Sequence, residues 1–100
     1  MEVSAFVKWS MDYIKSEGWN IPVTTFSDTV RIGVKIAEYS YPKPYDEYSI
    51  QSIYDAKTID DQRKLKSLVK FNLERMRIRL KSIDEYEKMR REIREQFGYS

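Results

Sequence analysis

Basic side chains gather in one stretch of this sequence, residues 62–82. The stretch holds eight Lys and Arg residues and a single acid, Glu74, so it carries a charge of +7. The residues before it carry −4 and the residues after it carry −1, which leaves a net charge of only +2 for the whole chain. Lys and Arg are the side chains that bind the phosphate groups of nucleic acids. This internal asymmetry therefore predicts a polyanionic partner.

Five of these residues share one flank of the helix that the stretch is expected to form. At about 100° per residue they fall within about 60° of one another and span about 27 Å along the axis. They are Arg63, Lys66, Lys70, Arg77 and Lys81, and we call them the basic stripe. Duplex DNA presents one phosphate charge per about 1.7 Å of axis, so such a stripe can meet several phosphates. The alternative is a solvated face that pairs with the acidic N-terminal half of the chain.

Other kinds of chemistry find little support in the composition. The chain has no Cys and no His, which excludes disulfides, thiolate nucleophiles, imidazole bases and cysteine-based zinc sites. Its glycines, Gly18, Gly33 and Gly98, lie too far apart to form a phosphate-binding loop. We expect no enzyme activity, no cofactor and no metal site. A nuclease that holds Mg²⁺ through carboxylates alone stays open as an alternative.

Two weaker nucleic-acid interpretations concern the middle of the chain. A helix-turn-helix over residues 34–56 would place Ser49, Gln51 and Ser52 in a groove, although its connection holds two prolines and lacks the usual glycine. Four tyrosines around those prolines could instead stack on unpaired bases. They are Tyr39, Tyr41, Tyr45 and Tyr48. A core-building helix and ordinary loop packing are the plainer interpretations.

The basic stripe needs a long helix, and the last two-fifths of the chain predict one. Residues 58–97 contain no Gly and no Pro, and Thr58 followed closely by two acids is typical of a helix N-cap. Apolar residues recur at steps of three and four, in a row that we call the seam. The seam consists of Leu65, Val69, Leu73, Met76, Leu80 and Ile83, and it drifts on through Tyr86, Met89, Ile93 and Phe97.

The length of this helix conflicts with a compact domain. Forty residues of helix are about 60 Å long, whereas a compact domain of this size has a radius of gyration of about 13 Å. An unbroken helix would protrude, and its seam would need a partner chain. We therefore expect a bend or break at Ser82, where Glu85 can complete a capping box and let the last helix fold back.

Two shorter helices are expected before Thr58. Apolar spacing predicts a helix over residues 3–17 that ends at Gly18. Trp9 and Tyr13 lie off its main apolar face and are expected to cover the edge of the core. A further short helix is expected over residues 46–56.

The segment between these two helices carries two competing patterns. Thr25 and Asp28 suit the capping box of a helix, whereas residues 30–36 alternate between apolar and polar side chains as a strand does. We favour a helix within residues 24–41. A hairpin within residues 21–39, turning at Ser27 and Asp28, is the alternative.

Together these patterns predict one mostly α domain over residues 1–100. We expect a bundle of about four helices with a long basic C-terminal helix, and an α+β fold containing the hairpin is the alternative. The favoured function is a small nucleic-acid-binding or regulatory protein that grips the phosphate backbone of DNA or RNA through the basic stripe. The alternative is a structural module that forms a homodimer, or binds an acidic protein partner, through its C-terminal helices and without nucleic acid.

Composition also carries expectations about location and assembly. No apolar run approaches the roughly 18 residues that span a membrane, and residues 1–4 do not resemble a secretory leader. We expect an intracellular, cytoplasmic homodimer, and a helix lying on an anionic membrane is a third interpretation. The high charge content with few Asn and Gln resembles that of thermophile proteins.

Overall fold

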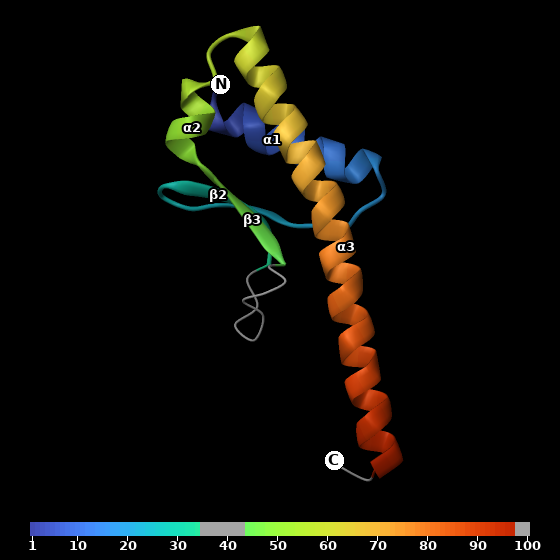
Figure 1. Ribbon diagram of the computed structural model, residues 1–100. Coiled ribbons are helices and arrows are strands. Elements are labelled where there is room, and N and C mark those ends of the chain that lie inside the picture. Colours follow the sequence, from blue (N-terminus) through green and yellow to red (C-terminus); the bar gives the residue numbers. More distant parts are fainter. Residues whose placement is uncertain (35–43, 98–100) are drawn as a thin grey trace.

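The computed structural model describes residues 1–34 and 44–97, and it shows three helices around a small antiparallel sheet (Figure 1). The elements follow in the order α1 (Val3–Ser16), β1 (Val23–Thr25), β2 (Thr29–Gly33), β3 (Tyr45–Ser49), α2 (Ile50–Asp55) and α3 (Ile59–Phe97). The mostly helical class is confirmed, although the described residues form three helices and not four. The three-stranded sheet, in the order β1-β2-β3, agrees with the alternative α+β architecture.

A β-hairpin stands where we favoured a helix. β1 and β2 pair antiparallel with Thr25 opposite Val30, and the chain turns at Ser27 and Asp28, where the alternative placed the turn. Val30 and Ile32 are both fully buried, because alternate residues of a strand point to the same face. Strand alternation therefore outweighed the local capping pattern. The part of this prediction beyond residue 34 lies outside the described residues.

The helix predicted over residues 46–56 is strand in its first part. Tyr45–Ser49 forms β3 and only Ile50–Asp55 is helical. The Ser49 hydroxyl accepts a hydrogen bond from the Ser52 amide at 3.1 Å, so it caps α2 and fixes its late start. The helix-turn-helix interpretation is therefore wrong here, since Ser49 ends a strand and α2 has six residues. The first helix of that motif lies outside the described residues.

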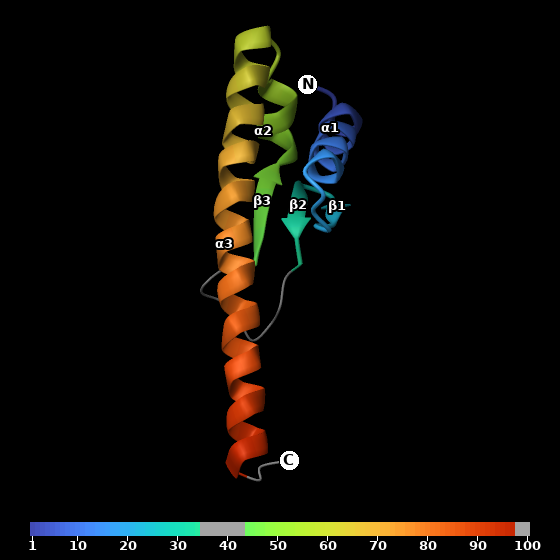
Figure 2. The same cartoon turned by 90° about the vertical axis from the view of Figure 1, so that its right-hand side faces the viewer.

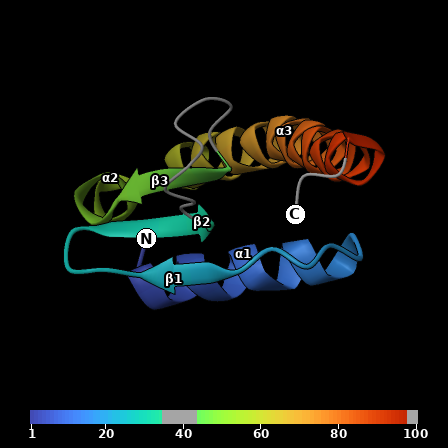
Figure 3. The same ribbon diagram turned by 90° about the horizontal axis from the view of Figure 1, so that it is seen from below.

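The core lies on one face of the sheet, where all three helices meet it. Seen from below in Figure 3, α3 lies on the β3 side and α1 on the β1 side. The buried core cluster consists of Phe6, Ile14, Val30, Ile32, Tyr48, Ile53, Val69, Leu73 and Met76. Three of these residues belong to the predicted seam, so the inward face of α3 was identified correctly. Ile83, also of the seam, is 6% exposed.

The helix α3 is unbroken over its 39 residues, so the bend or break predicted at Ser82 is wrong. The Ser82 hydroxyl donates a hydrogen bond to the Ile78 carbonyl at 3.1 Å, and so stays within the helix instead of capping a new one. Thr58 caps the start of α3 as predicted, because its hydroxyl accepts from the Asp61 amide at 3.1 Å. Figure 2 shows α3 running past the sheet and out of the domain. The radius of gyration is accordingly 16.6 Å, larger than that of a compact domain.

Two polar contacts join α3 to β3 beside the core. The Asn72 amide donates to the Tyr48 hydroxyl at 3.0 Å, and the Arg79 guanidinium pairs with Asp46 at 3.0 Å. Burial raises the pKa of Tyr48 to about 12, because a buried phenolate would lose its hydration. The Asp46 carboxylate acts in the same direction, while Asn72 and Arg79 oppose it. The folded protein therefore favours the neutral phenol of Tyr48.

The position of the core predicts that two isoleucines contribute differently to the free energy of unfolding. Ile53 is fully buried in the core cluster, whereas Ile59, at the first position of α3, is 73% exposed. We expect Ile53→Ala to lower the free energy of unfolding by about 2–5 kcal/mol, since it leaves a cavity. The matched control Ile59→Ala is expected to change it by about 0.5 kcal/mol or less. Urea unfolding curves of the two variants measure the difference, and equal midpoints would contradict this account of the core.

The pKa of Tyr48 predicts a loss of stability at alkaline pH. A tyrosine in the unfolded chain ionises near the ordinary tyrosine pKa of 10.0, while Tyr48 holds its proton to about 12 when folded. Between these pH values the unfolded state releases a proton that the folded state retains, so the free energy of unfolding falls as pH rises. We expect Tyr48→Phe to remove about 2 kcal/mol of this decline by pH 12.

Urea unfolding at pH 8 and pH 11.5 tests this expectation. The difference in unfolding free energy between the two pH values should be smaller for Tyr48→Phe than for the wild type. Tyr54→Phe is the matched control, because Tyr54 is 52% exposed. An alkaline decline that is the same in all three proteins would contradict the prediction.

Candidate nucleic-acid interface

The basic stripe lies on the flank of α3 that faces α1. The seam of α3 faces the sheet, and the stripe lies about a quarter turn around α3 from the seam, so the stripe faces the neighbouring helix α1. The Lys66 ammonium lies 5.6 Å from the ring centre of Trp9, and the Lys70 ammonium lies 5.2 Å from that of Tyr13. The Arg77 guanidinium lies 4.6 Å from the ring of Trp19. Three of the five predicted cations are thus brought together along one row of aromatic rings.

These rings form a continuous group that we call the aromatic ladder: Trp9, Tyr13 and Trp19. Trp9 and Tyr13 are four residues apart on α1, so they share a face, and their rings stack at 5.7 Å with an angle of 9°. Trp19 meets Tyr13 edge-on at 6.0 Å. Gly18, with a φ of 73°, ends α1 as predicted and lets the chain turn so that the Trp19 amide bonds to the Ile14 carbonyl at 3.1 Å. Trp9 and Tyr13 are half-buried, as expected for the edge of the core.

The aromatic ladder holds three cations without removing them from solvent. Lys66 is half-buried, Lys70 is exposed, and the Arg77 side chain is 50% exposed. A cation above an aromatic face is attracted to the ring by about 0.5–1 kcal/mol at an exposed site. The outer side of each charge still faces water. Each ammonium or guanidinium group can therefore bind an anion on its solvent side while the aromatic ring holds its other side.

The two remaining stripe residues mark the ends of the row. Arg63 and Lys81 are exposed, and within residues 1–34 and 44–97 neither has an ion pair or a ring contact. They lie on α3 about 27 Å apart along its axis. The arrangement is therefore three cations supported by aromatic rings with a freely solvated cation at either end.

Two carboxylates reduce the positive potential near the middle of the stripe. Glu74 lies 3.7 Å from the Arg77 guanidinium in a pair whose members are both at least half exposed. The pKa of Tyr13 is raised, first by desolvation of its hydroxyl and then by the negative charges of Glu17 and Glu74. Exposed ion pairs of this kind contribute little, about 0–1 kcal/mol, so an incoming phosphate can compete with Glu74 for Arg77.

Arg75 and Arg79 lie outside the stripe, as the helical phase predicts. Arg79 pairs with the carboxylate of Asp46 on β3. The Arg75 guanidinium lies 5.7 Å from the ring of Phe71 on the outer side of α3. Neither faces the aromatic ladder.

A further cation, on the open face of the sheet, was not anticipated from the sequence. The Arg31 guanidinium lies between the rings of Phe26 at 4.4 Å and Tyr45 at 5.1 Å, and 3.9 Å from Glu47. Arg31 and Glu47 stand opposite each other on β2 and β3, so only the strand register could have revealed the pair. Arg31 is therefore held on the sheet by Glu47 and two aromatic rings, and it does not belong to the basic stripe.

The proposed role of the tyrosines in stacking finds no support at the two that are described. Tyr48 is buried in the core, and Tyr45 is half-buried beside Arg31. Tyr39 and Tyr41 lie outside the described residues.

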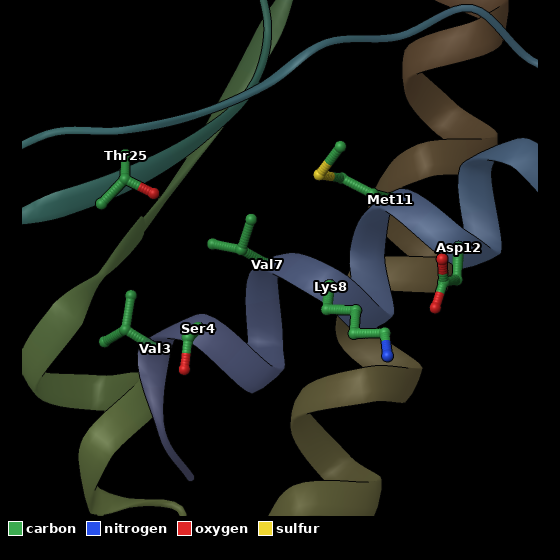
Figure 4. A pocket seen from close by; sticks show the side chains of 7 residues that line it. All are labelled: Val3, Ser4, Val7, Lys8, Met11, Asp12 and Thr25. Carbon is green, nitrogen blue, oxygen red and sulfur yellow. The ribbon is translucent and has the colours of Figure 1, made fainter.

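An open groove of about 510 Å³ runs between α1 and β1. Figure 4 shows Val3, Val7 and Met11 along α1 with Thr25 of β1 across from them, while Lys8 points away from the strand. Its lining is mostly apolar. The groove therefore offers no row of cations comparable with the stripe.

The other classes of site can be surveyed over the described part of the chain. Residues 1–34 and 44–97 contain no group of three carboxylates placed to hold a metal ion. None of the helices described there is long and apolar enough to cross a membrane. Comparison of the chain with protein-family models, with curated proteins and with solved structures gave no match. Functional inference therefore rests on the geometry of the stripe and of α3.

Proposed function

We propose that this protein binds the phosphate backbone of nucleic acids through the basic stripe, as a small nucleic-acid-binding or regulatory protein. The observation that carries the proposal is the row of cations that the aromatic ladder supports along one flank of a straight helix. Lys and Arg side chains lose rotamer entropy when they bind a phosphate. Ring contacts that already restrict Lys66, Lys70 and Arg77 reduce that loss.

The contacts expected in this mode are with phosphates and not with bases. The stripe presents ammonium and guanidinium groups, and base-specific reading in a groove needs an element that enters it with side chains aligned to base edges. Binding should therefore be sensitive to salt and only weakly dependent on sequence. For duplex DNA each phosphate neutralised contributes about −0.9 to the slope of log K against log salt concentration.

Removal of the two solvated end cations tests the stripe without disturbing the aromatic ladder. We expect Arg63→Gln/Lys81→Gln to weaken binding to a random-sequence DNA duplex and to make the salt slope about 2 units less steep, because two phosphate contacts are lost. Fluorescence anisotropy between 50 and about 200 mM NaCl measures both quantities.

The matched control removes two exposed cations that lie off the stripe. Lys8→Gln/Lys64→Gln changes the net charge by the same amount, with Lys8 on α1 and Lys64 on another face of α3. Its salt slope should stay close to that of the wild type. Equal weakening by the two double variants would show that only net charge matters, and a wild-type affinity independent of salt would remove the proposal itself.

Glu74 provides a test in the opposite direction. Because this carboxylate lies among the stripe cations and pairs with Arg77, Glu74→Gln should raise DNA affinity at low salt by about two- to fivefold. The gain should shrink as salt screens the charge. Glu95→Gln, an exposed acid near the end of α3, is the control and should leave the affinity unchanged. An affinity that falls or stays constant in Glu74→Gln would contradict a binding site at the stripe.

The second candidate is an interaction module that forms a homodimer or holds an acidic protein partner through α3, without nucleic acid. One observation favours it specifically: α3 continues unbroken beyond the domain, with apolar side chains left exposed along it. In that function the positive charge only steers the encounter. Dimer formation together with no DNA binding at low salt would favour this candidate over the first.

A further inference from the structure

The outward side of α3 carries a row of exposed apolar side chains. Leu68, Phe71, Ile78 and Met89 are 50%, 59%, 69% and 50% exposed. At about 100° per residue this row lies about 140° around the helix from the seam, so it faces away from the sheet and from the core. We call it the outer row.

The spacing of the outer row is that of a helix-pairing surface. Steps of three, seven and eleven residues place its members on the two core positions of a heptad. The intervening core positions are Arg75, Ser82 and Glu85, all exposed. Two of these intervening positions, Arg75 and Glu85, are charged and of opposite sign, and they alternate with the apolar residues of the outer row. A polar residue at such a position commonly fixes the register and orientation of a helix pair.

The charges at the core positions favour a second copy of the chain as the occupant of this surface, because Arg75 and Glu85 are of opposite sign and can pair between two copies. Residues 62–82 carry +7, whereas residues 83–100 contain five acids and carry −1. Side by side in parallel, two copies would place the +7 stretches together and each Arg75 against the other. Reversed, each basic stretch lies mostly beside the nearly neutral C-terminal part of the other copy, so most of the repulsion between the two +7 stretches is avoided.

One antiparallel register brings the charged positions together. When the two-fold axis crosses the helix pair at the level of residue 80, residues whose numbers add up to 160 face each other. Arg75 then faces Glu85 of the other copy, and Phe71 faces Met89, whose sulfur suits an aromatic neighbour. Ile78 faces Ser82. Both charged positions of the outer row are thereby paired.

We propose that a second copy of this chain docks antiparallel along the outer row, with Arg75 of each copy paired to Glu85 of the other. This inference rests on the second candidate function, and it does not depend on nucleic-acid binding. The globular parts of the two copies lie toward opposite ends of the helix pair, since each packs on the N-terminal half of its own α3. Four of the five basic-stripe residues stay outside the contact, and Lys81 lies at its edge, directly before the core position Ser82.

Charge reversal tests the orientation, with the dimer dissociation constant measured by analytical ultracentrifugation over a concentration series. We expect Arg75→Glu and Glu85→Arg each to weaken the dimer about tenfold or more, because each places like charges together twice in the symmetric pair. The double variant Arg75→Glu/Glu85→Arg should restore the dissociation constant to within about threefold of the wild type. Restoration cannot come from pairing within one helix, since ten residues of helix separate the two positions by about 15 Å.

The control is Asp84→Arg, which reverses an exposed acid next to Glu85 but on another face of α3. It should leave the dissociation constant unchanged. A wild-type protein that stays monomeric at every concentration overturns both homodimerisation and this inference. A wild-type dimer that the double charge swap does not restore overturns the antiparallel register alone and leaves homodimerisation standing.

Discussion

Burial of the seam of α3 against the sheet is the contact on which the other features of the molecule depend. Val69 and Met76 are fully buried and Leu73 is 1% exposed, all within the same cluster as Val30 and Ile32 of β2. A helix is stiff about its axis, so one buried face fixes the direction of every other side chain on it. The seam alone thus turns the basic stripe toward α1, Asn72 and Arg79 toward β3, and the outer row toward solvent.

The aromatic ladder shows that the positive charges on α3 are held by rings as well as exposed to solvent. The charge pattern alone allowed two interpretations: a phosphate-binding stripe, and a solvated face that pairs with acids. In the structure three stripe cations lie over aromatic rings, and Glu74 is the acid paired with one of them. These contacts give the cations a role in joining α1 to α3, each of modest strength because the charges remain exposed. Anion binding at the same groups adds to that role, since a cation can meet a ring on one side and a phosphate on the other.

Local patterns predicted much of α1 and α3, and non-local contacts account for what was missed. The cap at Thr58, the end of α1 at Gly18 and the inward phase of Val69 and Met76 all depend on residues within a few turns of one another. The strand at Val30 won over a helix because β2 is the central strand, paired on both sides, which no local pattern reveals. The aromatic ladder could not be predicted from local patterns for the same reason. Its rings come from α1 and the turn that follows it, and its cations from α3, so only the way α1 packs beside α3 brings them together.

The wrong prediction at Ser82 came from treating the chain as a single compact body. A helix already nucleated against a core extends at little further cost, because propagation adds a hydrogen bond for each residue fixed. The sequence beyond Ile83 favours extension, with acids placed four residues before bases, as in Asp84 and Lys88 or Glu87 and Arg91. A projecting helix therefore does not by itself require a partner. What points to one is more specific, namely opposite charges at two core positions of the outer row, in a helix whose two halves differ in charge from end to end.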